Sequence, residues 1–385
     1  MNGGHLVNFW KQCNANIADY VDFVFLYHGF KRVRSLEVLT NYPKYGTAKG
    51  RWKAEDDMKI LKMKLLKATG AIALALSTFS QAWAGEPVWD ANTVELELKK
   101  LSEGVYAVYD SRADDLSGQG VPMATSSGII VGDDGVMIVD TMMNERLNKQ
   151  LLNLVKTVTN KPVTYAVNTS FHGDHSYGNY YLPESVTVIQ HSNAKKYVDK
   201  NFKNDTKFMI QNFGENRGIE DVKASTGDIL INENSEITVD LGGRTVLIKD
   251  FGFAQTGGDV FVWLPQEKVI WMGNAIVSEK PGLPWLLDGH LVATLSTLQA
   301  VYDFLPSDTR VIPGHSYPVN KSDIKWNIDY LKDVKSQVSQ AVEKGFSLEK
   351  TVKTVSMNDY RGYALFDWVH PALNIPSAYK DLAQK

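Results

Sequence analysis

Two strand-rich stretches, each followed by helical sequence, constrain the fold of this chain more than any other feature. Short runs of β-branched and aromatic residues predict strands in the first stretch, at 94–98, 105–109, 127–131, 136–140, 163–167 and 186–190. A second group of predicted strands follows at 236–240, 244–250, 260–264, 269–272 and 311–312. Apolar periodicity predicts helices at 145–158, 192–202, 291–304 and 324–342. The order predicts an α/β protein, with sheets packed together and helices outside.

Composition limits the classes of protein that the chain can belong to. With 44% hydrophobic and 22% charged residues, it is neither disordered nor a multi-span membrane protein. The formal net charge of -3 gives no electrostatic basis for binding nucleic acid. Cys13 is the single cysteine, which excludes a disulfide framework and a thiolate cluster. Any bound metal must therefore have nitrogen and oxygen ligands.

An internal segment has the order of a secretory signal peptide. Residues 63–84 read as a short basic start, an apolar run and then Ala82-Trp83-Ala84. The apolar run of about a dozen residues is shorter than the roughly 20 that a spanning helix needs. A signal peptide must begin its chain, so we interpret residues 1–62 as a spurious or disordered N-terminal extension. The alternative is a genuine extension in which 63–84 forms an ordinary buried helix.

This interpretation predicts the domain order and the location of the mature protein. Residues 85–385 would form one domain, without a stable membrane anchor after processing. The removed segment carries more basic than acidic residues, so the mature domain would be more acidic than the whole chain. We expect export to the periplasm of a bacterium or secretion from it.

Candidate catalytic residues concentrate in NTSFHGDHSYGN, residues 168–179, directly after a predicted strand. His172, Asp174 and His175 lie within four positions of one another on this glycine-containing loop. With 8 histidines in the chain, a chance His-x-Asp-His is on the order of a one per cent event. Imidazole and carboxylate suit zinc. A loop in which Asp174 only caps backbone donors is the alternative.

Together with later stretches, the loop resembles the metallo-β-lactamase superfamily. The matching stretches are 250–276, VIPGHS at 311–316, IVDT at 138–141 and the tail at 370–382. The resemblance covers roughly 100–385 and implies a four-layer αββα sandwich with metals at one edge of the sheets. It places Asp140 where the family has a buried aspartate that braces the metal loop, bonded to backbone donors or to His172.

The resemblance also shows departures at three positions where the family places metal ligands. Ser170 stands where the loop usually begins with histidine, and Gln255 replaces a histidine before Thr-x-Gly-Asp. Asn274 stands where many members have an aspartate or cysteine. A hydroxyl and a neutral amide are poor replacements, so we expect the first metal position to be empty or weak. These three positions are interpreted as degenerate.

The second metal position keeps its ligands in the form found in the subclass that does not use the cysteine. Asp174, His175 and His315 match that set, with His172 as a possible further ligand. Three protein ligands and one open place are usual for catalytic zinc. We therefore expect one Zn²⁺ per chain, with another divalent metal as the alternative. Asp174 and His172 are the candidate catalytic residues, and His172 could hold water, shuttle a proton or simply bond to Gln255.

Three functions remain open from the sequence. The first is an exported hydrolase in which metal-activated hydroxide attacks a lactam, lactone, ester or thioester carbonyl of a small molecule. The second is a catalytically silent binding protein that has lost the binuclear site. An iron dioxygenase is disfavoured, because Gln255 replaces a histidine that such sites need. The substrate and the oligomeric state do not follow from the residues.

Overall fold

The computed structural model describes residues 90–117, 124–213 and 215–384. All of these residues belong to one of the two compact units into which the chain divides. The predicted N-terminal extension at 1–62 and the signal peptide at 63–84 lie outside the described residues. Within the described ranges, no helix combines the length and the apolar character needed to cross a membrane.

The first sheet has seven strands in sequence order. They are β1 (Leu96–Ser102), β2 (Val105–Asp110), β3 (Ser127–Val131), β4 (Val136–Val139), β5 (Val163–Val167), β6 (Thr187–His191) and β7 (Ile229–Ile231). Strands β1 to β4 pair antiparallel, whereas β4 to β7 pair parallel. Parallel neighbours need crossover connections. These contain α5 (Glu145–Val158), the short α6 (Gly173–Ser176) with η2 (Tyr177–Tyr181), and α7 (Ser192–Phe213).

The second sheet has six strands in the order β13-β12-β11-β10-β9-β8. Its members are β8 (Glu236–Asp240), β9 (Thr245–Lys249), β10 (Phe261–Leu264), β11 (Val269–Gly273), β12 (Arg310–Pro313) and β13 (Val319–Asn320). All neighbours are antiparallel except β11 and β12, which α8 (Leu291–Phe304) connects. The chain ends in α9 (Lys321–Glu343), α10 (Leu348–Thr354), η3 (Asn358–Tyr360), α11 (Phe366–Trp368), η4 (Val369–Asn374) and α12 (Ile375–Ala383).

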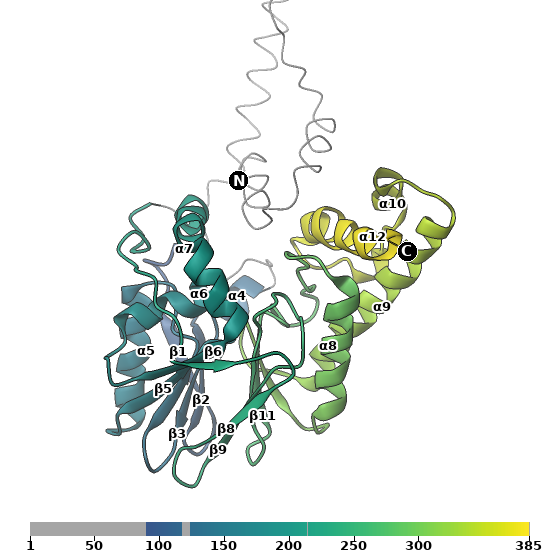
Figure 1. Ribbon diagram of the computed structural model, residues 1–385. Coiled ribbons are helices and arrows are strands. Elements are labelled where there is room, and N and C mark those ends of the chain that lie inside the picture. Colours follow the sequence, from purple (N-terminus) through teal and green to yellow (C-terminus); the bar gives the residue numbers. More distant parts are fainter. Residues whose placement is uncertain (1–89, 118–123, 214, 385) are drawn as a thin grey trace, which may run out of the picture. The chain divides into compact units, whose positions relative to one another are not determined.

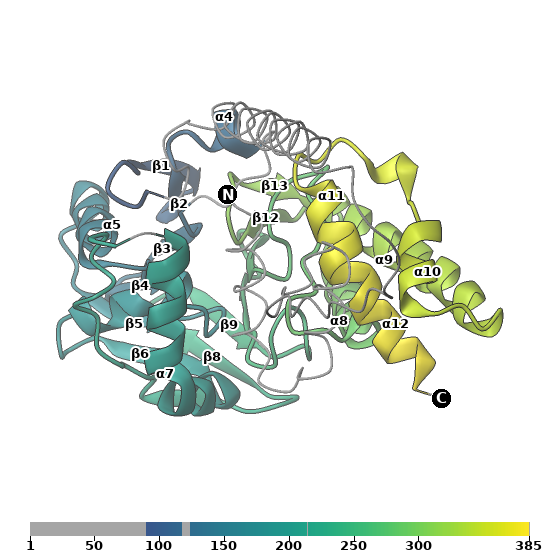
Figure 2. The ribbon, with the colours of Figure 1, turned by 90° about the horizontal axis from the view of Figure 1, so that it is seen from above.

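Alternation along the strands explains the layers. In β10, Val262 and Leu264 face the other sheet, whereas Phe261 and Trp263 pack with α8 and α9. In β4, Met137 and Val139 face the second sheet and Ile138 packs against α5. Because both faces of the central strands are covered, these strands are apolar throughout. Figures 1 and 2 show α5 and α7 on one side of the paired sheets and α8, α9 and α12 on the other. This confirms the predicted αββα sandwich.

Local sequence fixes where the main helices begin. Asn144 precedes α5, and its side chain accepts a hydrogen bond from the backbone N–H of Leu147. Asn320 and Asp323 form a reciprocal capping box at the start of α9. Such caps satisfy backbone donors that the first helical turn leaves unpaired. The caps therefore mark the residues at which α5 and α9 begin.

Candidate metal centre

The candidate site lies where strands of both sheets end. Asp140 follows β4, the loop from Asn168 follows β5, Asn274 follows β11, and Gly314-His315 follow β12. Strands β4 and β5 are parallel, as are β11 and β12. The carboxyl ends of parallel strands meet at one edge of a sheet, which is where ligand sites form in open α/β sheets. The topology therefore brings these four segments together.

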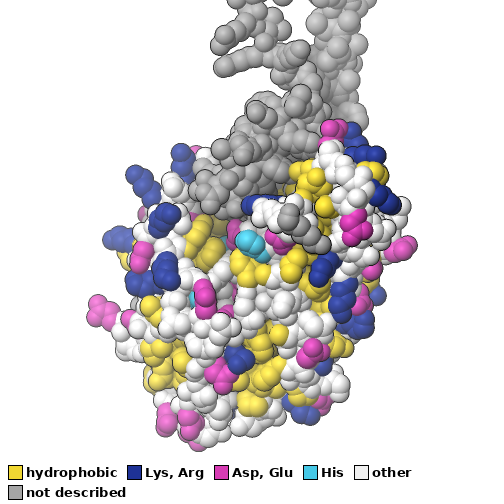
Figure 3. All heavy atoms as spheres, turned by 45° about the vertical axis from the view of Figure 1, so that its right-hand side comes forward, with side chains coloured by type: hydrophobic (Ala, Val, Ile, Leu, Met, Phe, Trp, Pro, Cys, Tyr) yellow, Lys and Arg dark blue, Asp and Glu magenta, His cyan; other side chains and the backbone are white. Residues whose placement is uncertain are grey.

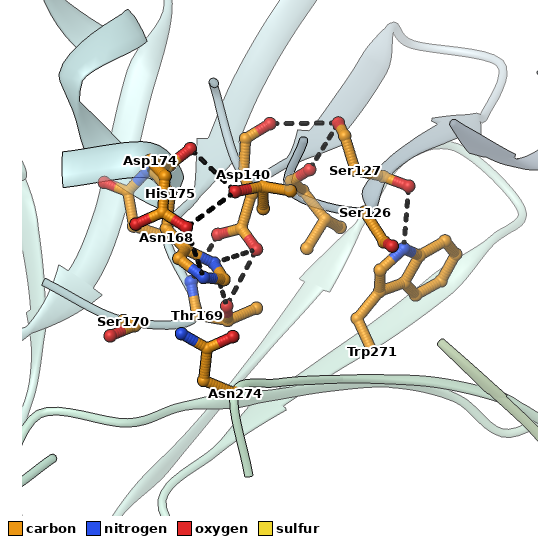
Figure 4. A network of polar contacts seen from close by, with 12 residues as sticks. Ser126, Ser127, Asp140, Asn168, Thr169, Ser170, Asp174, His175, Trp271 and Asn274 are labelled. Carbon is orange, nitrogen blue, oxygen red and sulfur yellow. Dashed lines mark hydrogen bonds and ion pairs between the residues drawn. The ribbon is translucent and has the colours of Figure 1, made fainter. Parts of the chain in front are cut away.

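Asp140 braces the loop that follows β5. It adopts a left-handed backbone conformation with a φ of 55°. One of its carboxylate oxygens accepts a hydrogen bond from the Thr169 backbone N–H at 2.7 Å, and the other accepts from Thr169 Oγ1 at 2.8 Å. The second oxygen also lies 2.8 Å from His175 Nδ1 (Figure 4). A carboxylate at this distance requires a proton on Nδ1, so the lone pair of the neutral ring is on Nε2.

Buried amides hold the backbone of the same loop. Asn168 donates to the His175 carbonyl at 3.1 Å, and Asn179 donates to Asn168 Oδ1 at 2.7 Å. Thr141, next to Asp140, donates to Asn179 Oδ1 at 2.9 Å. A Cβ on Gly178 would lie 1.7 Å from the Thr141 carbonyl oxygen, so only glycine fits there. The loop 168–179 is therefore anchored to the end of β4 on both sides of its histidines.

Asp174, His175 and His315 converge, although His315 comes from the other sheet. Asp174 Oδ2 lies 3.1 Å from His315 Nε2 and 3.5 Å from His175 Nε2. One ligand atom from each residue lies within 4.8 Å of the other two, and all three side chains are buried. Thr125 Oγ1 donates to the same Asp174 oxygen at 3.1 Å and to the Asp174 carbonyl at 2.9 Å. These contacts direct the carboxylate towards the two imidazoles.

The electrostatics of the trio fit a cation. Burial opposes ionisation of Asp174, but the imidazoles of His175 and His315 outweigh it and hold the pKa of that carboxyl far below its usual range. Burial likewise opposes a charge on His175, yet Asp140 and Asp174 raise the pKa of the ring to about 9. His175 Nε2 is buried and has no hydrogen-bond partner among the described residues. Two imidazoles and a carboxylate are a zinc ligand set, so the residues fit the metal.

His172 stands beside the trio and outside it. Burial lowers the pKa of its ring to about 4, so the side chain is neutral at neutral pH. Its Nδ1 lies 3.3 Å from the amide nitrogen of Asn274. The contact with Gln255 that the sequence left open is not formed, because the Gln255 amide donates to the Trp285 carbonyl at 3.4 Å. Asp140 likewise contacts His175 and Thr169 in place of His172.

Sequence reasoning missed residues that support the site from a distance along the chain. Thr125 and Ser126 precede β3 and belong to no recognisable motif. Ser126 donates from its backbone to the Gly314 carbonyl at 2.7 Å, and its Oγ accepts from the Ser316 backbone N–H at 2.9 Å. These bonds hold the loop of His315. The short segment Ala124–Ser127 carries no sequence signal by which this role could have been found.

Comparisons with known proteins agree with the fold. The sequence model of the metallo-beta-lactamase superfamily matches residues 120–315. A type 2 metallo-beta-lactamase of Bacillus cereus is 22% identical over 272 residues, which are 70% of this chain and 96% of the relative. One of Bacillus sp. (strain 170) is 21% identical over 279 residues, covering 71% and 98%.

A solved structure shows the same fold. The stereoselective inverting sec-alkylsulfatase Pisa1 from Pseudomonas sp. superimposes with a TM-score of 0.56 and 17% identity, over 74% of this chain and 50% of that chain. The chain belongs to the metallo-beta-lactamase superfamily. As a member it is a metal-dependent hydrolase.

Proposed function

We propose that this protein is an exported hydrolase that holds one divalent metal at Asp174, His175 and His315. Zinc is the metal we expect. The substrate would be a small molecule with a lactam, lactone, ester or thioester carbonyl. One observation carries the proposal: one ligand atom each from Asp174, His175 and His315 lies within 4.8 Å of the other two, and all three side chains are buried. A metal would displace the proton of His175 Nε2 and bind the three groups together.

The residues of the site have separable tasks under this proposal. When bound, a divalent metal polarises a carbonyl oxygen and lowers the pKa of water. Asp140 keeps the proton of His175 on Nδ1, which leaves Nε2 free to bind. His172 is neutral, and because the Asn274 amide faces its Nδ1, its Nε2 carries the proton. We propose that His172 orients water or a substrate oxygen through that N–H.

Two features support a small-molecule substrate. Lys and Arg side chains are interspersed with acidic ones on the face shown in Figure 3, which is unlike the continuous basic surface of nucleic-acid-binding proteins. The curated relatives are named metallo-beta-lactamases, so β-lactams are the first compounds to test. Fold and metal do not choose among carbonyl substrates, so the assay must include all four classes.

Metal removal and replacement test this function. The purified protein is expected to contain about one zinc per chain, to lose it with a strong chelator, and to regain it from added zinc. Hydrolysis of at least one substrate in a panel of β-lactams, lactones, esters and thioesters should fall and recover with the metal. One bound zinc with no turnover across the panel would instead support a catalytically silent binding protein.

The proposed export is tested separately. If residues 63–84 are a signal peptide, the protein recovered from the periplasm or medium should begin at or near Gly85. N-terminal sequencing of that protein measures the cleavage site directly. Recovery of an intact chain beginning at Met1 would contradict both the export and the interpretation of residues 1–62 as an extension that the mature protein lacks.

A further inference from the structure

Asn274 is wedged between the two loops that carry the metal ligands. It directly follows Gly273, which has a φ of 51° and whose Cβ would lie 2.4 Å from Thr169 Oγ1. That hydroxyl lies 3.2 Å from His175 Nδ1. On the other side, a Cβ on Gly314 would lie 2.0 Å from Asn274 Oδ1. The Asn274 amide therefore contacts Gly314, the residue before His315. The backbone just before Asn274 packs against Thr169, which contacts His175.

The two ends of the Asn274 amide have different surroundings. Its nitrogen lies 3.3 Å from His172 Nδ1, which orients the group. Its oxygen is buried and has no hydrogen-bond partner among the described residues, as is also true of His175 Nε2. Figure 4 shows the side chain pointing towards the segment that carries Thr169 and His175.

We propose that Asn274 Oδ1 is a fourth protein ligand of the metal held by Asp174, His175 and His315, so that water or a substrate oxygen would take a fifth place, which zinc can accommodate. This inference rests on the proposed metal site and goes beyond its three ionisable ligands. It also reverses the expectation from the sequence, which treated Asn274 as a degenerate position. The contact of the amide nitrogen with His172 Nδ1 would orient the side chain so that its oxygen faces the metal.

The proposed ligand set has a distinct chemistry. An amide oxygen is a neutral, hard donor, whereas an aspartate or cysteine at the same place would add a second negative charge. With one carboxylate, two imidazoles and one amide, a divalent ion keeps a net charge of about +1 in the site. We therefore expect a strongly Lewis-acidic metal that is bound less tightly than a site with two anionic ligands would bind it.

A cysteine at position 274 gives a direct test of coordination. In Asn274→Cys loaded with Co²⁺, we expect a near-ultraviolet sulfur-to-cobalt charge-transfer band, because the thiolate takes the place of the amide oxygen. The unsubstituted protein, whose single cysteine is Cys13, is the control and should lack the band. A Co²⁺-loaded variant with the same spectrum as the control would overturn the proposal.

Zinc affinity, measured by competition with a chelating dye, gives a second test. Asn274→Ala is expected to weaken binding by about tenfold or more, since even groups beyond the ligands change affinity 10–100-fold. Asn274→Asp should restore or strengthen binding. Asn327→Ala is a matched control, because Asn327 is also buried with an unpartnered Oδ1 but lies on α9. Unchanged affinity in a folded Asn274→Ala would defeat this inference, whereas failure of the unsubstituted protein to bind zinc would defeat the proposed function itself.

Discussion

Replacing His315 with alanine is expected to abolish metal retention and turnover together. His315 is the proposed ligand that the second sheet supplies, and its Nε2 lies 3.1 Å from Asp174 Oδ2. Without it, Asp174 and His175 remain on a single turn and cannot enclose an ion. We expect zinc affinity to fall by at least about 100-fold, the upper limit typical of groups that only support ligands.

Zinc content after gel filtration and hydrolytic rate at saturating zinc measure this prediction. The matched control is His290→Ala, because His290 is exposed and stands in front of α8, 3.8 Å from Asp381. That variant should keep its zinc and its rate. A His315→Ala protein that retains about one zinc and full turnover would show that the trio is not the metal site.

Restoring the family's histidines should change the stoichiometry of the site. In the double variant Ser170→His, Gln255→His, three imidazoles with His172 would be available at the first metal position. We expect zinc content to rise from about one to about two per chain. Ser170 and Gln255 are 1% and 3% exposed, so the added ring at position 170 must displace neighbours, at a cost of about 1–3 kcal/mol of stability.

The single variants are the controls for this prediction. Each would provide two imidazoles at the first position, which is too few for a stable zinc site, so each should stay near one zinc per chain. Elemental analysis gives the stoichiometry, and thermal unfolding shows whether each protein is folded. Two zinc ions in the unsubstituted protein would contradict the one-metal proposal, as would a folded double variant that binds only one.

Elements with strong local signals were predicted accurately from the sequence. The apolar pattern and flanking turns gave β5 (Val163–Val167), α5 (Glu145–Val158) and α8 (Leu291–Phe304) with the observed limits. Elements whose stability comes from neighbours were missed or shortened. β7 (Ile229–Ile231) is three residues long and gains its order by pairing with β6, and α7 extends to Phe213, well past the predicted end at 202.

For the site, too, the residues close together in the sequence could be predicted, whereas contacts between distant segments could not. The short spacing of His172, Asp174 and His175 is written into one loop, so the sequence identifies it. The contact of Asp140 with His175, and the position of the Asn274 amide beside Gly314, depend on how strands from two sheets end at one edge. No local pattern encodes such a meeting of distant segments, and Thr125 shows that even a direct contact with Asp174 can come from an unremarkable sequence.

If Asp174, His175 and His315 hold the metal as proposed, their origin in both sheets makes metal binding contribute to the stability of the fold. Asp174 and His315 are about 140 residues apart in the chain, and a metal that binds them bridges the two halves only when both are folded. Any ligand that binds solely the folded state shifts unfolding by mass action, by about 2.7 kcal/mol at a free concentration 100 times its Kd. The supply of zinc in the surroundings would thereby set how long each molecule persists as well as how fast it works.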